Sequence, residues 1–222
     1  MSALALPAFA QSKPMKIGVI GSGRIGSTFG GLWAKAGHEI MFSDRDPGAV
    51  KRAVDSVGSR ARGGSVQEAV AFGDAILIAV PYGALPAIRD QVGAQLKGKV
   101  VIDPNNPVPN RDGEMAVGAK EKGAAVSTAA ILPGARLVRA FNSWGYAIMA
   151  REANRPAPRM AIPVAADDPE ALKVGMQLVS DAGFDPVHAG SLADSKAYDL
   201  GSSVSGRVLT ADELRQALKL KP

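Results

Sequence analysis

The sequence predicts an α/β fold: a doubly wound parallel sheet with helices on both faces and a small C-terminal extension. Two observations predict it. Apolar strand-like runs alternate with stretches of helical periodicity, and a Gly-x-Gly-x-x-Gly turn separates the first run from the first stretch. The 222 residues, 46% of them hydrophobic, suffice for one large α/β domain. We expect residues 1–14 to be an extension or signal-peptide remnant, and residues 15–222 to form one domain whose extension begins near residue 160.

The first unit is predicted as strand, turn, helix and strand. Residues 16–20 are apolar and rich in β-branched side chains, and apolar residues at helical spacing follow the turn as far as Ala36. Gly37 suits the end of that helix, and residues 38–43 read as the second strand. Later strands are expected at 75–80, 100–102, 137–141, 160–164 and 184–188. Later helices are expected near 47–57, 65–72, 84–95, 143–152, 168–182 and 210–220.

Two of these helices begin with capping residues. Asp168 stands directly before Pro169 and Glu170, a pattern typical of a helix N-cap with an acidic first turn. Thr210 is followed three residues later by Glu213, which predicts a capping box at the start of the terminal helix. These signals fix the starts of two elements independently of hydrophobic periodicity.

The glycine-rich turn has the residues and the context of a Rossmann dinucleotide site. It consists of Gly21, Ser22, Gly23, Arg24, Ile25 and Gly26. Gly21 permits the tight turn, Gly23 lets backbone N–H groups approach a pyrophosphate, and Gly26 allows close packing of helix on strand. The helix N-terminus then faces the phosphates with unpaired donors. We therefore expect an NAD(P)-binding site here, the alternative being a plain strand–helix connection that binds nothing.

The end of the second strand, at Ser43, Asp44 and Arg45, is expected to contact the adenosine ribose. Asp44 favours NAD because its carboxylate accepts hydrogen bonds from the ribose hydroxyls and repels a 2′-phosphate. Arg45 favours NADP because its guanidinium can pair with that phosphate, unless it is a solvated loop residue. The residues alone leave the two cofactors open.

Three further strand ends are expected to meet the same ligand, because the carboxyl ends of parallel strands line one crevice. After the strand at 75–80, Ala79, Val80 and Pro81 would contact the cofactor. Asn105, Asn106 and Asn142 are candidates for holding the nicotinamide amide or ribose. Tyr82 and Trp144 are candidates for stacking on a flat substrate ring, with core packing as the alternative.

We assign no catalytic side chain and no metal site. His38 directly follows Gly37, far from the strand ends, and is expected at the surface. His188 ends the last predicted strand, but no carboxylate or substrate hydroxyl is placed beside it, so a structural role is preferred. The chain has no cysteine, which excludes thiolate catalysis and cysteine-ligated metals.

Charge and hydropathy exclude two classes of partner. The net charge of +5 is spread along the chain instead of forming a block, so no nucleic-acid partner is expected. No apolar run approaches the ~20 residues of a membrane-spanning helix. Residues 2–11 resemble the end of a secretory signal with an Ala-x-Ala site but lack a basic region. We expect a cytoplasmic protein, with a periplasmic location as the alternative.

In the order and spacing of these motifs the chain resembles the NADP oxidoreductase family named for coenzyme F420-dependent enzymes, from residue 15 to about 220. The matching segments are residues 15–37, 73–82, 100–107, 132–142 and 183–193. The resemblance implies a homodimer that transfers hydride directly between NADP(H) and a flavin or deazaflavin (F420-like) acceptor, ring to ring, with no side-chain acid or base. The family often has Ser, Thr or Asn before the arginine at the end of the second strand, where this chain has Asp44.

Two classes of function follow. The first is an NAD(P)H-dependent oxidoreductase acting on a small-molecule acceptor. The second is a non-catalytic dinucleotide-binding protein that serves as a redox sensor or partner module. A related enzyme class, the β-hydroxyacid and imine reductases, shares the glycine pattern but ordinarily has a catalytic lysine and a large helical C-terminal domain.

Overall fold

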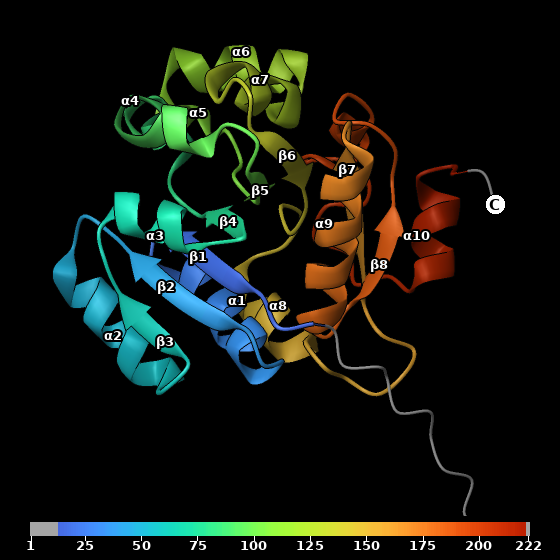
Figure 1. The fold of residues 1–222 in the computed structure, drawn as a ribbon. Coiled ribbons are helices and arrows are strands. Elements are labelled where there is room, and N and C mark those ends of the chain that lie inside the picture. Colours follow the sequence, from blue (N-terminus) through green and yellow to red (C-terminus); the bar gives the residue numbers. More distant parts are fainter. Residues whose placement is uncertain (1–12, 221–222) are drawn as a thin grey trace, which may run out of the picture.

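A computed structural model describes residues 13–220 and contains one eight-stranded sheet in the order β3-β2-β1-β4-β5-β6-β7-β8 (Figure 1). Its strands are β1 (Lys16–Ile20), β2 (Glu39–Ser43), β3 (Ala61–Gly63), β4 (Ala75–Ile78), β5 (Val100–Asp103), β6 (Arg136–Arg139), β7 (Ala161–Ala166) and β8 (Asp185–His188). Neighbouring strands from β3 to β6 run parallel. The predicted Rossmann-type α/β class is confirmed.

The expectation of a wholly parallel sheet is wrong at β7, which runs antiparallel to β6. The connection between them is a helix of only seven residues, α8 (Tyr146–Glu152), about 10 Å long, followed by a proline-containing loop. In the observed register Arg139, the last residue of β6, lies opposite Ala165 near the end of β7. The chain therefore enters β7 from the end of the sheet at which it left β6. Strand β8 then pairs parallel with β7.

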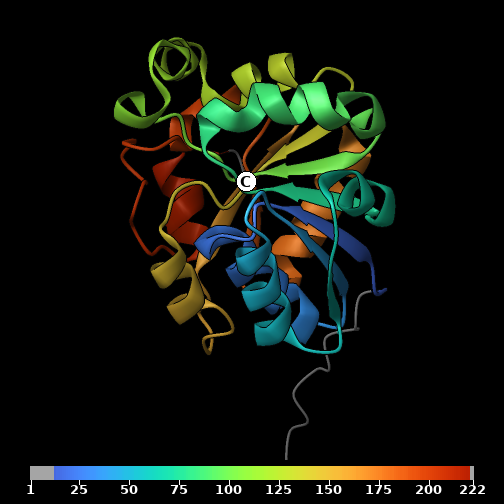
Figure 2. The same ribbon diagram turned by 90° about the vertical axis from the view of Figure 1, so that its left-hand side faces the viewer.

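Helices cover both faces of the sheet, as predicted (Figures 1 and 2). One face carries α1 (Arg24–Lys35), α2 (Pro47–Val57), α8 and α9 (Pro169–Asp181). The other carries α3 (Val66–Phe72), α4 (Leu85–Leu96), α6 (Glu114–Lys122) and α7 (Ala124–Ile131). The elements α5 (Pro109–Asp112), α10 (Ala211–Ala217) and the 3-10 turns η1 (Tyr82–Ala84) and η2 (Asp194–Tyr198) complete the described chain.

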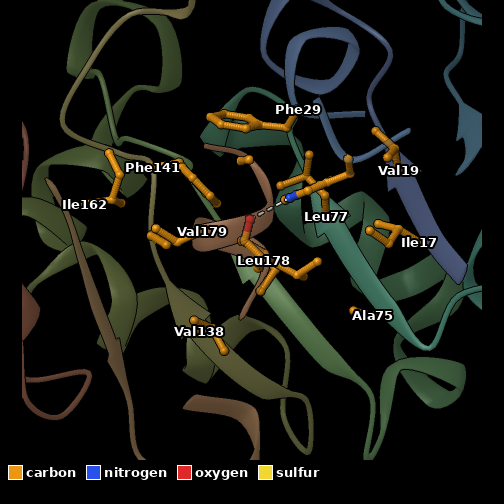
Figure 3. Close-up of a cluster of buried hydrophobic side chains, with 14 of the residues drawn as sticks. Ile17, Val19, Phe29, Ala75, Leu77, Val138, Phe141, Ile162, Leu178 and Val179 are labelled. Atoms are coloured by element: carbon orange, nitrogen blue, oxygen red, sulfur yellow. Dashed lines mark hydrogen bonds between the residues drawn. The ribbon is translucent and has the colours of Figure 1, made fainter. Parts of the chain in front are cut away.

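Alternation of side chains along the strands creates two cores, one under each helix layer. The α1-side core, drawn in Figure 3, includes Ile17, Val19, Phe29, Leu77, Val138, Phe141 and Leu178. The α4-side core includes Ile20, Val70, Ile76, Ile88, Val101 and Ala125. In the α1-side core the buried indole of Trp33 donates a hydrogen bond of 2.8 Å to the carbonyl of Leu178, which joins α1 to α9.

Both predicted caps are present. Asp168 accepts a hydrogen bond from the N–H of Ala171 (2.8 Å) at the start of α9. The capping box at Thr210 and Glu213 starts α10. Residues 109–131 were not expected to be helical, although they form α5, α6 and α7. The first of these is a single turn, and α7 has an alanine-rich sequence without an apolar stripe, so hydrophobic periodicity gives no signal there.

The stretch from about residue 160, expected as an extension, supplies β7, β8 and α10 to the same sheet and its covering. A third cluster, which includes Val187, Tyr198 and Leu214, packs this part of the chain together. Within residues 13–220 no helix combines the length and apolar character needed to cross a membrane. The signal-like segment, residues 2–11, lies outside the described residues.

Candidate functional site

The glycine turn between β1 and α1 has the backbone geometry expected of a dinucleotide site. Gly21 has a φ of +97°, and its N–H donates to the carbonyl of Ser43 (2.8 Å). A side chain at Gly21 would strike the carbonyl of Ala79, and one at Gly26 would strike the carbonyl of Gly21. A side chain at Gly23, by contrast, would meet no protein atom within 4 Å. The first and third glycines are therefore required by the fold, whereas the second borders open space.

This open space lies at the N-terminus of α1, which has twelve residues. Gly23 is its N-cap residue, and no side chain caps the helix. The N–H groups of the first turn have no intrahelical partners, and the helix dipole makes this end positive. Uncapped donors beside open space fit the pyrophosphate of a dinucleotide. Exposed Arg24 adds a positive charge, with its guanidinium 5.1 Å from the centre of the Tyr146 ring, while half-buried Ile25 packs on the α1-side core.

The end of β2 is tied directly to this turn by Asp44. Its Oδ2 accepts a hydrogen bond from the N–H of Ser22 (2.7 Å), and its Oδ1 accepts one from the N–H of Asp46 (3.0 Å). Both oxygens are therefore held by the backbone. Ser43 is buried, and its hydroxyl donates to the carbonyl of Val19 (3.1 Å), so it joins β1 to β2. Arg45 is exposed.

The end of β4 borders the same turn, because the N–H of Ala79 donates to the carbonyl of Ile20 (2.8 Å). Ala79 and Val80 are half-buried and Pro81 is exposed. The structure does not support stacking of Tyr82 or Trp144 on a substrate. Tyr82 is fully buried in the α4-side core, and this burial raises the pKa of its hydroxyl. Trp144 is also buried, and its indole N–H donates to the carbonyl of Arg207 (2.8 Å).

Three asparagines brace the loops that follow β5 and β6. Asn105 Nδ2 donates to the carbonyl of Ile78 (2.8 Å), which joins the ends of β5 and β4. Asn106 Nδ2 donates to the carbonyl of Asn142 (2.6 Å), and Asn142 Nδ2 donates to the carbonyl of Tyr198 (3.0 Å). Asn105 and Asn142 therefore hold these loops in place, and their contact with a bound ligand stays a prediction.

The residue before Asn142 has an unusual backbone. Phe141 has a φ of +64°, in the left-handed region that a bulky side chain rarely occupies. Its ring is buried and lies 4.1 Å from the ring of Phe29, measured between centroids, so packing maintains this conformation. Such strain, costing on the order of 1–3 kcal/mol, collects at functional sites. Here it turns the chain sharply at the carboxyl end of β6.

Sequence reasoning missed a buried ionic group behind these loops. Arg139 is 0% exposed at the end of β6, directly beside Asp103 at the end of β5 in the sheet register. Its Nη1 donates to Asp103 Oδ2 (3.2 Å), and its Nη2 donates to Asp199 Oδ1 (2.8 Å) and Asn106 Oδ1 (3.1 Å). Burial raises the pKa of Asp103, although Arg139 acts in the opposite direction. The sequence signal for this group was a charged residue at the end of each of two apolar strands, Asp103 in β5 and Arg139 in β6.

The two histidines lie elsewhere. His38 was expected at the surface, which is wrong: it is 0% exposed. Its Nδ1 accepts from the N–H of Met15 (3.0 Å), so Nε2 carries the proton and donates to Asp181 Oδ2 (3.0 Å). His188 is exposed at the end of the edge strand β8. In the described part of the chain no group of three or more His, Asp or Glu side chains could hold a metal ion.

Comparison with solved structures agrees with this fold. The hypothetical protein SMa0349 from Sinorhizobium meliloti aligns with a TM-score of 0.76 at 24% identity, over 90% of this chain and 97% of that protein. A protein from Arthrobacter sp. FB24, named "putative F420 dependent NADP-reductase", aligns with a TM-score of 0.68 at 20% identity, over 82% and 88%. The 3-hydroxyisobutyrate dehydrogenase of Mycobacterium tuberculosis aligns with a TM-score of 0.62 at 18% identity, over 83% of this chain and 57% of the dehydrogenase.

Comparison of sequences finds two partial similarities. A stretch of 37 residues is 57% identical to the protein YjhV of Escherichia coli K12, and this match spans 17% of the chain and 27% of YjhV. Residues 16–107, which hold the glycine turn, Asp44 and strands β1 to β5, match a family model. The resemblance expected from the sequence is thereby confirmed over residues 16–107, where the chain is similar to the family described as NADP oxidoreductase, coenzyme F420-dependent.

Proposed function

We propose that the protein is an NAD(P)H-dependent oxidoreductase that passes hydride to a flavin or deazaflavin acceptor, such as coenzyme F420, by direct ring-to-ring transfer. The observation that carries the proposal is the uncapped N-terminus of α1, which borders open space at Gly23 and lies beside Asp44. The family description of residues 16–107 supports both the dinucleotide and the reaction class.

In this mechanism the chain contributes binding and orientation. The first turn of α1 would hold the pyrophosphate, and Ala79, Val80 and Pro81 would form an apolar surface against the nicotinamide. When bound, the nicotinamide supplies the hydride. Because the two rings react directly, proximity and alignment account for the acceleration, and no side chain need act as acid or base. The rigid loops after β5 and β6 suit that task, since misplacement by about 1 Å is costly.

For the dinucleotide itself we propose a preference for NADH, although the family description names NADP. Asp44 lies where a ribose-binding carboxylate is expected, and two backbone N–H groups hold its oxygens. The Asp44 side chain cannot rotate away to admit a 2′-phosphate without losing its hydrogen bonds to the N–H groups of Ser22 and Asp46. Arg45 is exposed and offers the phosphate only a solvent-screened charge.

Two other functions remain as outcomes of the test. One is a non-catalytic redox sensor or partner module. The other is the reaction class of the hydroxyacid dehydrogenase and imine reductases, which share the fold with this chain. A homodimer and a small-molecule acceptor remain proposals, as does the cytoplasmic location.

The test is to titrate the purified protein with NADH and NADPH separately, and then to follow the reduced-nicotinamide absorbance band while adding FMN, FAD, coenzyme F420 or a ferric chelate. We expect binding of NADH and turnover with a flavin or deazaflavin. Tight nucleotide binding without turnover on any acceptor would identify a binding module, and turnover only on an imine or a 3-oxo acid would identify the alternative enzyme class. If neither NADH nor NADPH binds, the proposal is refuted.

A further inference from the structure

We propose that a pocket beside the end of β5 is the acceptor site, and that it binds the phosphate or carboxylate substituent of a planar redox acceptor. The inference rests on the proposed function. The pocket is a cavity of about 230 Å³. Its lining includes Pro107, Lys120, Lys196, Asp199, Leu200 and Ser202.

The location follows from the hydrogen bonds of Arg139. One nitrogen of its guanidinium, Nη2, donates both to Asp199, in the wall of the pocket, and to Asn106, in the loop after β5. The next residue of that loop, Pro107, itself lines the pocket. In a Rossmann fold the loop after this strand flanks the ligand crevice. The pocket therefore adjoins the loop that follows β5.

The wall formed by η2 and the residues after it is fixed from several directions. The hydroxyl of Tyr198 donates to the carbonyl of Arg139 (3.2 Å), and the carbonyl of Tyr198 accepts from Asn142 Nδ2 (3.0 Å) and from the hydroxyl of Ser143 (2.8 Å). Asp199 Oδ2 accepts from the N–H of Ala124, the first residue of α7 (3.0 Å). Figure 2 shows this red segment on the same side of the molecule as α6 and α7. Such bracing is typical of a preformed ligand site.

The charge of the pocket favours an anion. Asp199 is already compensated by Arg139 and by the Ala124 N–H. Lys196 donates to the carbonyl of Glu121 (2.7 Å), an uncharged partner, and so keeps its positive charge at the pocket. Lys120 is exposed on α6 and brings a second ammonium group. Two exposed lysines in the lining, together with one compensated carboxylate, leave an excess of positive charge that attracts a phosphate or carboxylate.

Size and polarity indicate which part of the acceptor enters. A cavity of about 230 Å³ is below the ~300–1,000 Å³ typical of pockets that enclose a drug-sized ligand. It suits a charged substituent better than a whole tricyclic ring. Leu200 is 48% exposed and offers an apolar surface at the same site, which suits the adjoining ring or chain. The buried hydroxyl of Ser202 has no hydrogen-bond partner among residues 13–220, so a ligand oxygen could use it.

FMN and riboflavin provide a matched pair of probes, because they share one ring system and differ by a phosphate. The experiment measures equilibrium binding of each by fluorescence to protein saturated with the oxidised nucleotide, so that no turnover is required. The variants are Lys120→Ala, Lys196→Ala and the double substitution. The control is Lys122→Ala, which removes an exposed lysine on the same helix that does not line the pocket.

We expect FMN to bind at least tenfold more tightly than riboflavin. The double variant should lose most of that difference, while Lys122→Ala retains it. Equal affinity for the two flavins, an unchanged preference in the double variant, or failure of both flavins to bind would overturn the inference. A protein that shows the lysine-dependent preference but reduces no acceptor would keep the pocket and refute the proposed function. Turnover without the lysine-dependent preference for FMN would keep the proposed function and refute the assignment of the pocket.

Discussion

The N–H of Ser22 donates a hydrogen bond of 2.7 Å to the carboxylate of Asp44. This bond joins the glycine turn to the end of β2 and fixes the carboxylate at the border of the proposed nucleotide site. A charged acceptor makes it stronger than an ordinary backbone bond. The residue proposed to contact the ribose is therefore also the residue that shapes the turn, and in the proposed function its negative charge sets the choice of nucleotide.

Replacing Asp44 by Asn should shift the preference from NADH toward NADPH. The amide oxygen can still accept a backbone hydrogen bond, but the charge that repels a 2′-phosphate is gone. We expect the ratio of the two dissociation constants to change on the order of tenfold or more, where tenfold corresponds to about 1.4 kcal/mol. Asp55→Asn is the control, because Asp55 is an exposed partner of Lys51 on α2. An unchanged ratio in the Asp44 variant would show that this carboxylate does not face the ribose.

Gly23→Val should abolish binding of both nucleotides while leaving the fold intact. Its side chain would enter the open space at the start of α1, where it meets no protein atom but would block a pyrophosphate. Gly26→Val, in contrast, should lower the free energy of unfolding, because its side chain would strike the Gly21 carbonyl. Calorimetric titration and urea unfolding separate the two effects. Full nucleotide affinity in Gly23→Val would remove the basis of the proposed function.

Most of the fold could be predicted because it depends on local signals. Residues 47–57 form α2 as predicted, and β1 and the capping box at Thr210 also lie where the sequence indicates. The direction of β7 could not be predicted in this way, since hydrophobic alternation is the same in a parallel and an antiparallel strand. It depends on the length and path of the α8 connection, which only tertiary packing determines.

The parts of the site that were missed or misplaced depend on long-range partners. His38 is polar and follows a glycine, which predicts a surface position. It is buried because its ring hydrogen-bonds to Asp181, 143 residues away in the sequence. Tyr82 stands at a strand end like a ligand contact, but the α4-side core encloses it. Arg139 and Asp103 needed the strand register to be recognised as neighbours. The glycine turn, by contrast, carries its whole geometry within six residues.

Asp112 should contribute stability that is lost in acid. Burial alone would raise the pKa of this carboxyl, but hydrogen bonds from Arg111 and from the N–H groups of Val108 and Gly83 lower it to about 2. A lowered pKa stabilises the folded protein above the unfolded value of about 3.9, and this contribution is lost progressively as the pH falls below that value and through about 2. The shift corresponds to about 2 to 3 kcal/mol.

Urea unfolding between pH 7 and pH 2.5 tests this expectation in Asp112→Asn. The variant should be less stable than the wild type at pH 7, and the difference should shrink to about one third of that value by pH 2.5. Asp90→Asn serves as the control, because Asp90 is exposed and pairs with its neighbour Arg89. A constant difference between wild type and Asp112→Asn across the whole range would contradict the assignment of a low pKa to Asp112.

Arg139→Met should be strongly destabilising, because it leaves Asp103 buried without its countercharge. Removing one member of a buried ion pair costs about 3–5 kcal/mol. Arg136→Met on the same strand is the matched control. Arg136 pairs with Asp168 in a partly exposed contact, and its loss should cost about 1 kcal/mol or less. Adding Asp103→Asn to Arg139→Met should recover part of the loss, since the uncompensated charge is then removed. Equal losses in the two single variants would contradict a stabilising buried ion pair between Arg139 and Asp103.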